Sequence, residues 1–423
     1  MSFGLYKADS KDWLVFILGL FTMLKVRLLG TFGISEIIMI PLFVVTAKNN
    51  PFFKNKKAVR LFTFAILWAF STALTDLLRE STLEDSAKGL VSIIFLILIL
   101  PVAYWALYDR PQRVAYYLAG LAISSILGFE FQDSIDLNES DADVWQVYAF
   151  EYLAVFIAGL CFYRNRKALG YAALIGYGVW ALYHSSRNVF LLFLTASILI
   201  FLVYHFNKHQ ISSTQSQIRF NKHFLIIASV LLIGFIGVTN TYEHLASTGA
   251  LGQAAKVKYD LQKNSAIGLA SGRADFFIAL KMIEESPIIG YGSYAKDKHE
   301  LAYQETKELG LKTKDLYLQH KIRNKFIPGH SYILGAWVYN GILSLPFWIY
   351  SIILIAQYFK KNLYSDLRIT PIMIVWNLIM LWNIFFSPFA NRPVIAMLLA
   401  ALLAIQSQLT IKSNKTSVYS YNV

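Results

Sequence analysis

Residues 88–107 read KGLVSIIFLILILPVAYWAL, and this stretch decides the fold class. After Lys88 it carries no charged side chain. About 20 residues of α-helix span about 30 Å, which is the thickness of the hydrocarbon core of a bilayer. Similar apolar runs recur along the chain, so we predict an all-α, polytopic integral membrane protein with about 12 transmembrane helices.

The predicted spans divide the chain into four parts. Residues 1–240 contain helices one to nine, 241–330 form a large outer loop, 331–410 contain helices ten to twelve, and 411–423 are a tail. The first span carries Lys25 and Arg27 near its end, and the tenth is long enough to begin as a helix along the interface. The spans lie near residues 13–28, 30–47, 60–78, 88–107, 114–130, 147–163, 169–184, 188–206, 224–240, 331–358, 369–387 and 393–410.

Composition excludes several other classes of protein. The chain is 56% hydrophobic and only 15% charged, and a soluble domain cannot hide that much apolar surface. The net charge of +13 would suit a nucleic-acid partner, but the positive residues gather in short loops between apolar runs, so no nucleic acid is expected. The single cysteine, Cys161, excludes a disulfide framework and a cysteine-based metal cluster.

The loops alternate in charge, which predicts their orientation. Basic loops at 48–60, 164–167, 207–223 and 360–368 should be cytoplasmic, and the loops at 80–85 and 133–143 are acidic or mixed. Both termini then lie inside, and the segment 241–329 lies outside. Within it, Arg273 to Glu285 (RADFFIALKMIEE) has helical spacing, with one face formed by Phe276, Phe277, Leu280 and Ile283.

The end of this predicted helix also has a signature. Ser286-Pro287 should stop it, and Gly290-Tyr291-Gly292 should form a turn that directs the loop back toward the membrane. The glycine-rich run lacks the strand and lysine of a nucleotide phosphate loop, so we do not interpret it as one.

Three residues placed on the outer side suit chemistry on an anion. His330 opens the tenth span, and a histidine changes charge near neutral pH, so it suits proton abstraction from a hydroxyl. Arg187 follows Ser186 in a tight turn, and Arg273 leads the loop helix. A guanidinium can donate paired hydrogen bonds to a phosphate. Each residue also has a structural interpretation: a helix-end anchor, a solvated charge or a phospholipid contact.

Other charged residues near the membrane have simpler interpretations. We interpret Arg392 as an end residue whose side chain reaches toward the outer water. Asp76 and Glu151 are carboxyl groups within predicted spans, and they are expected to pair with Arg187, Lys25 or backbone groups.

With these residues in place, the chain resembles the O-antigen ligase and O-antigen polymerase superfamily of bacterial envelope glycosyltransferases. The likeness covers roughly residues 186–344 and rests on the order of its motifs and on the 12-span layout with a large outer loop before the tenth span. Ser344 stands where a threonine or glycine is more usual in the ligase form. The motifs are Ser186-Arg187, Gly272-Arg273 before an aromatic-rich helix, Gly290-Tyr291-Gly292, and His330-Ser331 followed by a nine-residue gap and Gly341.

The resemblance implies a GT-C type glycosyltransferase in the bacterial inner membrane, multi-pass, with its active site facing the periplasm and with no cofactor or metal. The donor would be a glycan on undecaprenyl diphosphate, and the acceptor a lipid-linked repeat unit or lipid A-core. His330 would be the catalytic base, Arg187 and Arg273 would bind the diphosphate, and Ser186, Tyr291 and Ser331 would support the site. Membrane lipids and a chain-length regulator protein are the other expected partners.

Four functions stay open on the sequence alone. A long polar insert at residues 295–325 favours a polymerase that recognises a specific repeat unit, although a ligase has a use for the same insert in meeting core phosphates. A protein O-oligosaccharyltransferase is a further member of the group. The non-enzymatic alternative is a transporter or lipid-linked glycan flippase, which 12 spans also suit, but the two halves of the chain show no similarity.

Overall fold

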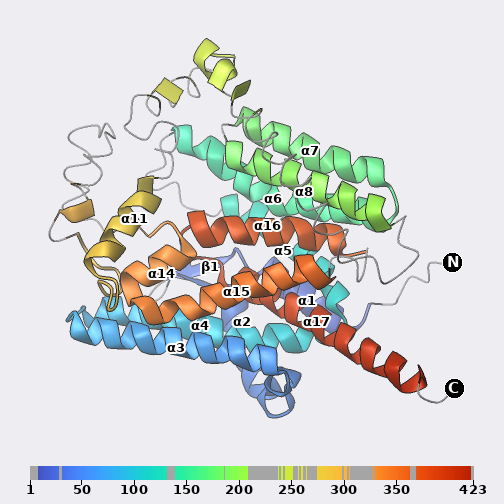
Figure 1. The fold of residues 1–423 in the computed structure, drawn as a ribbon, viewed down its shortest axis with the longest axis horizontal. Coiled ribbons are helices and arrows are strands. Elements are labelled where there is room, and N and C mark those ends of the chain that lie inside the picture. The colour runs from blue at the N-terminus through green and yellow to red at the C-terminus, as the bar shows by residue number, and fades with distance from the viewer. Residues whose placement is uncertain are drawn as a thin grey trace.

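A computed structural model gives the fold of this protein (Figure 1). The structure describes residues 8–27, 31–130, 139–184, 186–207, 237, 240–241, 243–250, 256, 259–260, 263, 274–297, 300–302, 304, 327, 329–362 and 368–420. The predicted ninth span, near 224–240, and the insert at 295–325 lie almost wholly outside these residues.

Helices form nearly all of the described structure, as the apolar runs predict. Caps fix several of their starts: the Asn55 side chain accepts hydrogen bonds from the backbone N–H groups of Lys57 and Ala58, and Thr82 accepts one from Asp85. The main helices are α1 (Ser10–Leu20), α2 (Ile34–Thr46), α3 (Lys56–Leu78), α4 (Leu83–Leu107), α5 (Val114–Glu130), α6 (Glu139–Tyr163), α7 (Lys167–Tyr183), α8 (Arg187–Asn207), α11 (Ala274–Glu285), α14 (Tyr332–Asn340), α15 (Leu345–Gln357), α16 (Thr370–Phe386) and α17 (Arg392–Ser420).

Within the described residues, five helical stretches are long and apolar enough to cross a membrane by length and composition: Lys56–Leu78, Leu83–Leu107, Arg187–His205, Ile342–Lys360 and Arg392–Leu409. Val147–Tyr163 and Thr370–Phe386 are shorter apolar helices. The prediction of a mostly helical protein is therefore confirmed, and several of its apolar helices are suited to span a membrane. The count of about 12 spans and the GT-C architecture stay predictions.

The first predicted span, near 13–28, is wrong as one continuous helix. α1 ends at Leu20, and the chain then forms a short antiparallel hairpin from β1 (Lys25–Arg27) and β2 (Thr31–Gly33). Hydrogen bonds hold the chain where it leaves the helix, because Ser124 accepts the N–H of Met23 at 2.9 Å. The residues after α1 are still mostly apolar, so composition alone did not predict that the helix ends there. α2 begins only at Ile34.

The tenth predicted span, near 331–358, is also interrupted. α14 ends at Asn340, and a 3-10 turn (Ile342–Ser344) leads into α15. Gly341, between them, has a φ of 79° and a ψ of −178°, a conformation that is essentially restricted to glycine. The run reads as one long apolar helix in sequence but folds as two.

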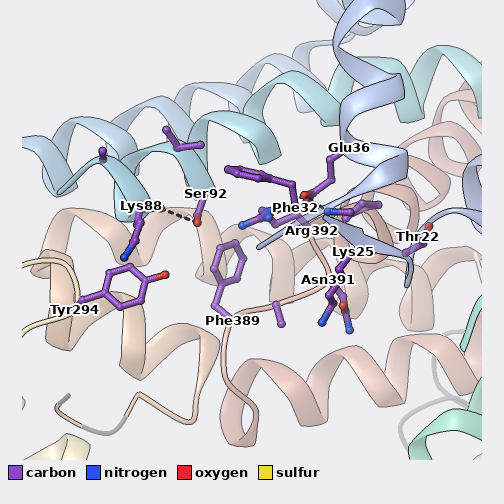
Figure 2. Close-up of a pocket in the computed structure, with 15 residues that line it drawn as sticks. Thr22, Lys25, Phe32, Glu36, Lys88, Ser92, Tyr294, Phe389, Asn391 and Arg392 are labelled. Carbon is purple, nitrogen blue, oxygen red and sulfur yellow. Dashed lines mark hydrogen bonds and ion pairs between the residues drawn. The ribbon is translucent and has the colours of Figure 1, made fainter. Parts of the chain in front are cut away.

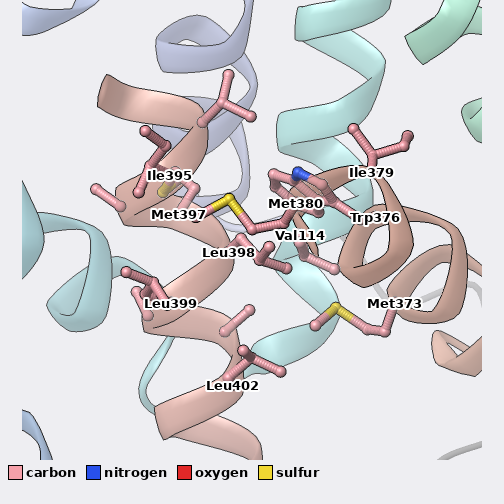
Figure 3. Close-up of a cluster of buried hydrophobic side chains, with 14 of the residues drawn as sticks. Val114, Met373, Trp376, Ile379, Met380, Ile395, Met397, Leu398, Leu399 and Leu402 are labelled. Atoms are coloured by element: carbon pink, nitrogen blue, oxygen red, sulfur yellow. The ribbon is translucent and has the colours of Figure 1, made fainter. Parts of the chain in front are cut away.

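Part of the apolar core, which extends over most of the described helices, lies between the C-terminal helices and α5 (Figure 3). Trp376 of α16 is almost fully buried and stacks on Tyr117 of α5, with ring centroids 5.9 Å apart and an interplanar angle of 8°. Met380, Met397 and Leu398 fill the adjoining space. This packing fixes α16, which in turn holds the residues that start α14.

The two ends of the bundle have different polar chemistry. At one end α3 stops, α4 begins, and α11 and residues 286–293 pack beside them; we call this the loop end (Figure 1). At the opposite end, Arg113 is 2% exposed and binds the carboxylates of Asp9, Asp12 and Asp109 at 2.6, 3.0 and 2.7 Å. The hydrogen bond from Arg113 is the largest factor that lowers the pKa of Asp9 below its ordinary value of 3.8.

Candidate functional site

His330 lies at the loop end and contacts an acidic residue of α11. Its Nδ1 is 2.5 Å from Oδ2 of Asp275, in the first turn of that helix. Both side chains reach water, with 55% and 40% of their surface exposed. A carboxylate that accepts the Nδ1 proton leaves Nε2 as the ring nitrogen able to take a proton from another group.

The helix that follows His330 is held firmly at its start. Ser331 is 1% exposed and caps α14, because its hydroxyl oxygen accepts the backbone N–H of Leu334 at 3.1 Å. The same hydroxyl donates to the carbonyl of Ile384, near the end of α16, at 2.9 Å. Ser331 therefore positions the backbone of His330 rather than facing a ligand.

The turn after α11 folds back onto the helical bundle, as the sequence predicts. The backbone N–H groups of Tyr291 and Gly292 donate to the carbonyls of Val338 and Tyr339 in α14, at 2.8 and 2.9 Å. The N–H of Ile342 donates back to the carbonyl of Ile288 at 3.1 Å. Residues 287–292 and the break after α14 thus fix each other's conformation.

Two glycines make this close contact possible. Gly290 and Gly341 both have positive φ, at 74° and 79°, and their backbones meet directly. A Cβ at Gly341 would lie 2.2 Å from the carbonyl oxygen of Ile288, and one at Gly290 would lie 2.7 Å from the nitrogen of Gly341. The glycine-rich run is a packing element of the loop, which agrees with the prediction that it is not a nucleotide phosphate loop.

The buried carboxyl group of Asp76 receives this loop. Its oxygens accept the backbone N–H of Ser293 at 2.5 Å and the Ser293 hydroxyl at 2.7 Å. Gly89 of α4 leaves room for Ser293, since a Cβ there would lie 2.0 Å from the Ser293 hydroxyl oxygen. Of the partners expected for Asp76, a backbone group is therefore correct. Glu151 is 6% exposed, and its carboxyl group has no hydrogen-bond partner among the described residues.

Sequence reasoning missed Arg79, which extends the same attachment. Its Nε donates to the carbonyl of Gly290 at 2.8 Å, and its Nη2 donates to the Ser286 hydroxyl at 2.6 Å. The guanidinium also lies over the ring of Tyr291, 5.7 Å from the centroid. Tyr291, expected to support the site, holds the loop to α3 through this contact.

Arg187 is the first residue of α8, a helix that packs along α16. Ser186, just before it, is 3% exposed, and its N–H donates to the Ala181 carbonyl at 2.8 Å. Leu182, at the end of α7, packs against Ala246 and Tyr259, so this turn adjoins the long predicted outer segment. Arg273 lies outside the described residues, directly before α11.

The face of α11 that is buried differs from the predicted one. Leu280 is 43% exposed, and the buried side chains are those of Ile278, Ala279, Met282 and Ile283. Phe276 packs against Phe386 of α16, with centroids 5.7 Å apart. The prediction of the helix is confirmed. Its buried face is rotated from the predicted one, because α11 packs against α14 and the end of α16.

A cavity of about 400 Å³ opens at the loop end, between the hairpin, the first turns of α4 and residues 389–393 (Figure 2). Lys25, Lys88 and Arg392 line it, together with the carboxylate of Glu36. Arg392 binds Glu36 through two hydrogen bonds, of 2.6 and 2.8 Å. The interpretation of Arg392 as an end residue reaching toward water is therefore wrong, because a carboxylate 356 residues away holds it.

Lys25 belongs to the hairpin rather than to a membrane span, and it faces this cavity. Partial dehydration lowers the pKa of Lys25, and the positive charge of Arg392 lowers it further, against a smaller opposing effect of Glu36. Lys25 is nevertheless exposed, because part of its side chain borders the open space of the cavity. An anion in the cavity would stabilise the charged lysine.

The partner of His330 and the residues that line the cavity differ in how well the sequence predicted them. Asp275 had one signal, since it lies two residues after Arg273 in the first turn of a predicted helix. Lys25, Lys88 and Glu36 had none, because only the fold brings their segments together. No protein-family model and no curated protein matches this chain.

Proposed function

We propose that this protein is an O-antigen polymerase-type membrane glycosyltransferase, which joins undecaprenyl-diphosphate-linked repeat units at the periplasmic face. The observation that carries the proposal is the contact of His330 with Asp275 at the end of the bundle where the loop packs. A histidine oriented by a carboxylate and accessible to a substrate is an arrangement that suits general-base catalysis on a hydroxyl.

In the proposed reaction, an acceptor sugar hydroxyl approaches Nε2 of His330. Its oxygen forms a bond to the anomeric carbon of the donor as the bond from that carbon to the diphosphate oxygen breaks. The hydroxyl proton moves to Nε2, and the diphosphate leaves with the bonding electron pair. Attack opposite to the leaving group inverts the anomeric centre. Because diphosphate is already a good leaving group, we expect no metal ion or nucleotide to be needed.

Asp275 has a positioning role in this scheme. By accepting the Nδ1 proton it selects the tautomer in which Nε2 is basic, and it stabilises the imidazolium that forms. Its 2.5 Å contact with His330 spans two segments far apart in the chain, so the loop helix must be docked for the base to be oriented. The hydrogen bonds of Asp76 and Arg79 to the loop serve this docking.

The two arginines complete the proposal. Arg187 and Arg273 would bind the diphosphate and stabilise the negative charge that develops on it as it leaves. Support for Arg187 is its position at the start of α8, where the turn after α7 adjoins the long segment. Support for Arg273 is that it directly precedes the helix that carries Asp275.

A lipopolysaccharide gel from a deletion strain separates the alternatives. Loss of a polymerase leaves core with one repeat unit, and that is the result we expect. Bare core with accumulated lipid-linked polymer would identify a ligase that transfers the chain to lipid A-core. Bare core, with single lipid-linked repeat units trapped on the cytoplasmic side, would identify a flippase and contradict the proposal.

Metal independence is tested on the purified protein. We expect transfer between lipid-linked repeat units to continue at an unchanged rate when a chelator is added. In the proposed mechanism, arginine side chains rather than a metal ion provide the positive charge that stabilises the diphosphate. Loss of transfer with the chelator, and its return with a divalent cation, would contradict this mechanism.

A further inference from the structure

The cavity between the hairpin, α4 and residues 389–393 is lined by three cationic side chains, of which Lys25 is not neutralised by an ion pair among the described residues. Its only carboxylate, among the described residues that line it, is Glu36, and Arg392 already holds both oxygens. Lys88 pairs with Glu84, which is 72% exposed and does not line the cavity. Lys25 has no ion-pair partner among the described residues. A binding site for an anion explains why these cations share one cavity.

Backbone dipoles add to this positive potential. α2 begins at Ile34 and α17 at Arg392, and Gly33 and Asn391, just before these helices, both line the cavity. The backbone N–H groups of Gly33, Ile34 and Ser35 are already bonded, to Glu36 and to the carbonyls of Leu24 and Phe21. The helix starts therefore contribute the partial positive charge of their dipoles, which favours a phosphate. Two such ends beside three cationic side chains form a site whose positive potential suits an oxyanion.

Part of the remaining cavity wall is apolar. Phe32, Phe389 and Val91 line it, and the cavity volume of about 400 Å³ is within the usual range for a small-molecule site. Beside it, Ile37 of α2 and Ile94 of α4 have 41% and 38% of their surface exposed. A head group in the cavity can therefore place its acyl or prenyl tail along apolar helix surfaces.

We propose that this cavity binds the phosphate group of a lipid, with Lys25 and Lys88 contacting the phosphate and α2 and α4 contacting the lipid tail. Arg392, held by Glu36, forms part of the cavity wall. Phe389 packs against the ring of Tyr332, two residues after His330, with centroids 5.8 Å apart. The proposal requires only that the protein binds a phospholipid here, so it is independent of the transfer reaction.

Native mass spectrometry of the full-length protein in detergent tests this binding. The probes are phosphatidic acid, diacylglycerol with the same acyl chains, and inorganic phosphate. We expect phosphatidic acid to be retained at least about tenfold better than diacylglycerol, which corresponds to about 1.4 kcal/mol. Equal retention of the two lipids would overturn the phosphate assignment, and binding of inorganic phosphate as tight as that of the lipid would overturn the lipid assignment.

Variants place the bound lipid in the cavity. Lys25→Gln removes a cation without breaking a hydrogen bond of the fold, and we expect it to weaken retention of phosphatidic acid about tenfold. Ser92→Asp adds a carboxylate at the α4 wall and should weaken it further. The matched control is Lys281→Gln, which removes an exposed lysine of α11 outside the cavity. Wild-type retention by both cavity variants, with unchanged melting temperatures, would overturn the proposal.

Discussion

At the scale of single residues, the chemistry depends on the orientation of His330 by Asp275. His330→Ala removes the proposed base, so we expect the transfer rate to fall about 10²–10⁴-fold. Asp275→Asn should give a smaller loss and move the acid limb of the pH–rate profile to lower pH, because a carboxylate stabilises the protonated imidazole. A merely structural role for Asp275 would change the amount of folded protein but not the profile. Glu284→Gln, on the exposed side of the same helix, is the control.

Arg187 gives a second prediction at this scale. Arg187→Lys keeps the charge but loses the forked pair of donors, and each hydrogen bond to a charged group contributes about 1.5–3 kcal/mol. We therefore expect transfer to fall by about tenfold or more. The control is Arg166→Lys, in the exposed turn before α7. Wild-type transfer by Arg187→Lys would mean that positive charge alone is sufficient.

At the scale of elements, the attachment of the loop depends on glycines that let two backbones touch. Gly341→Ala places a Cβ 2.2 Å from the carbonyl oxygen of Ile288, at a φ of 79°, so we expect a loss of about 1–3 kcal/mol of stability. Gly176→Ala, in α7, has no atom within 4 Å of the new Cβ and should keep or slightly raise stability. Thermal unfolding in detergent measures both; equal melting temperatures would contradict the close approach.

The sequence predicted the elements better than their ends. The long apolar runs predicted α3, α4 and α8 correctly, because a helix satisfies every backbone hydrogen bond within such a run. Ser286-Pro287 predicted the end of α11. The sequence did not predict the hairpin at Lys25, where tertiary hydrogen bonds end α1. It also did not predict which face of α11 is buried, because that depends on the side chains of α14 that pack against it. Asp76 was recognisable as a buried carboxyl, but its partner, Ser293, is 217 residues away and has no local signal.

At the scale of the whole molecule, the opposite end of the bundle is held by the Arg113 network. The hydrogen bond from Arg113 lowers the pKa of Asp9 below its ordinary 3.8. The Asp9 carboxylate therefore contributes stability that is complete above about pH 4 and is lost as the pH falls through the lowered pKa. We expect Asp9→Asn to unfold with a weaker dependence on pH below this value than the wild type. An identical acid dependence in both proteins would contradict the network's role.

Sidedness is also a property of the whole molecule. Single cysteines in a Cys161→Ala background can report it with a membrane-impermeant maleimide. We expect Ile288→Cys, at a loop-end position that is 71% exposed, to react from the periplasmic side of intact cells. We expect Lys48→Cys, in a predicted cytoplasmic loop, to react only after the membrane is opened. The reverse pattern would place the proposed site on the cytoplasmic side.

The most direct test of the proposed function measures transfer in vesicles that contain only the purified protein and a lipid-linked repeat unit. The wild type should produce a ladder of longer lipid-linked chains. His330→Ala, folded to the same extent by thermal unfolding, should leave the single repeat unit unextended over the same time. A ladder of normal length and rate from His330→Ala would contradict the proposed role of this histidine as the base.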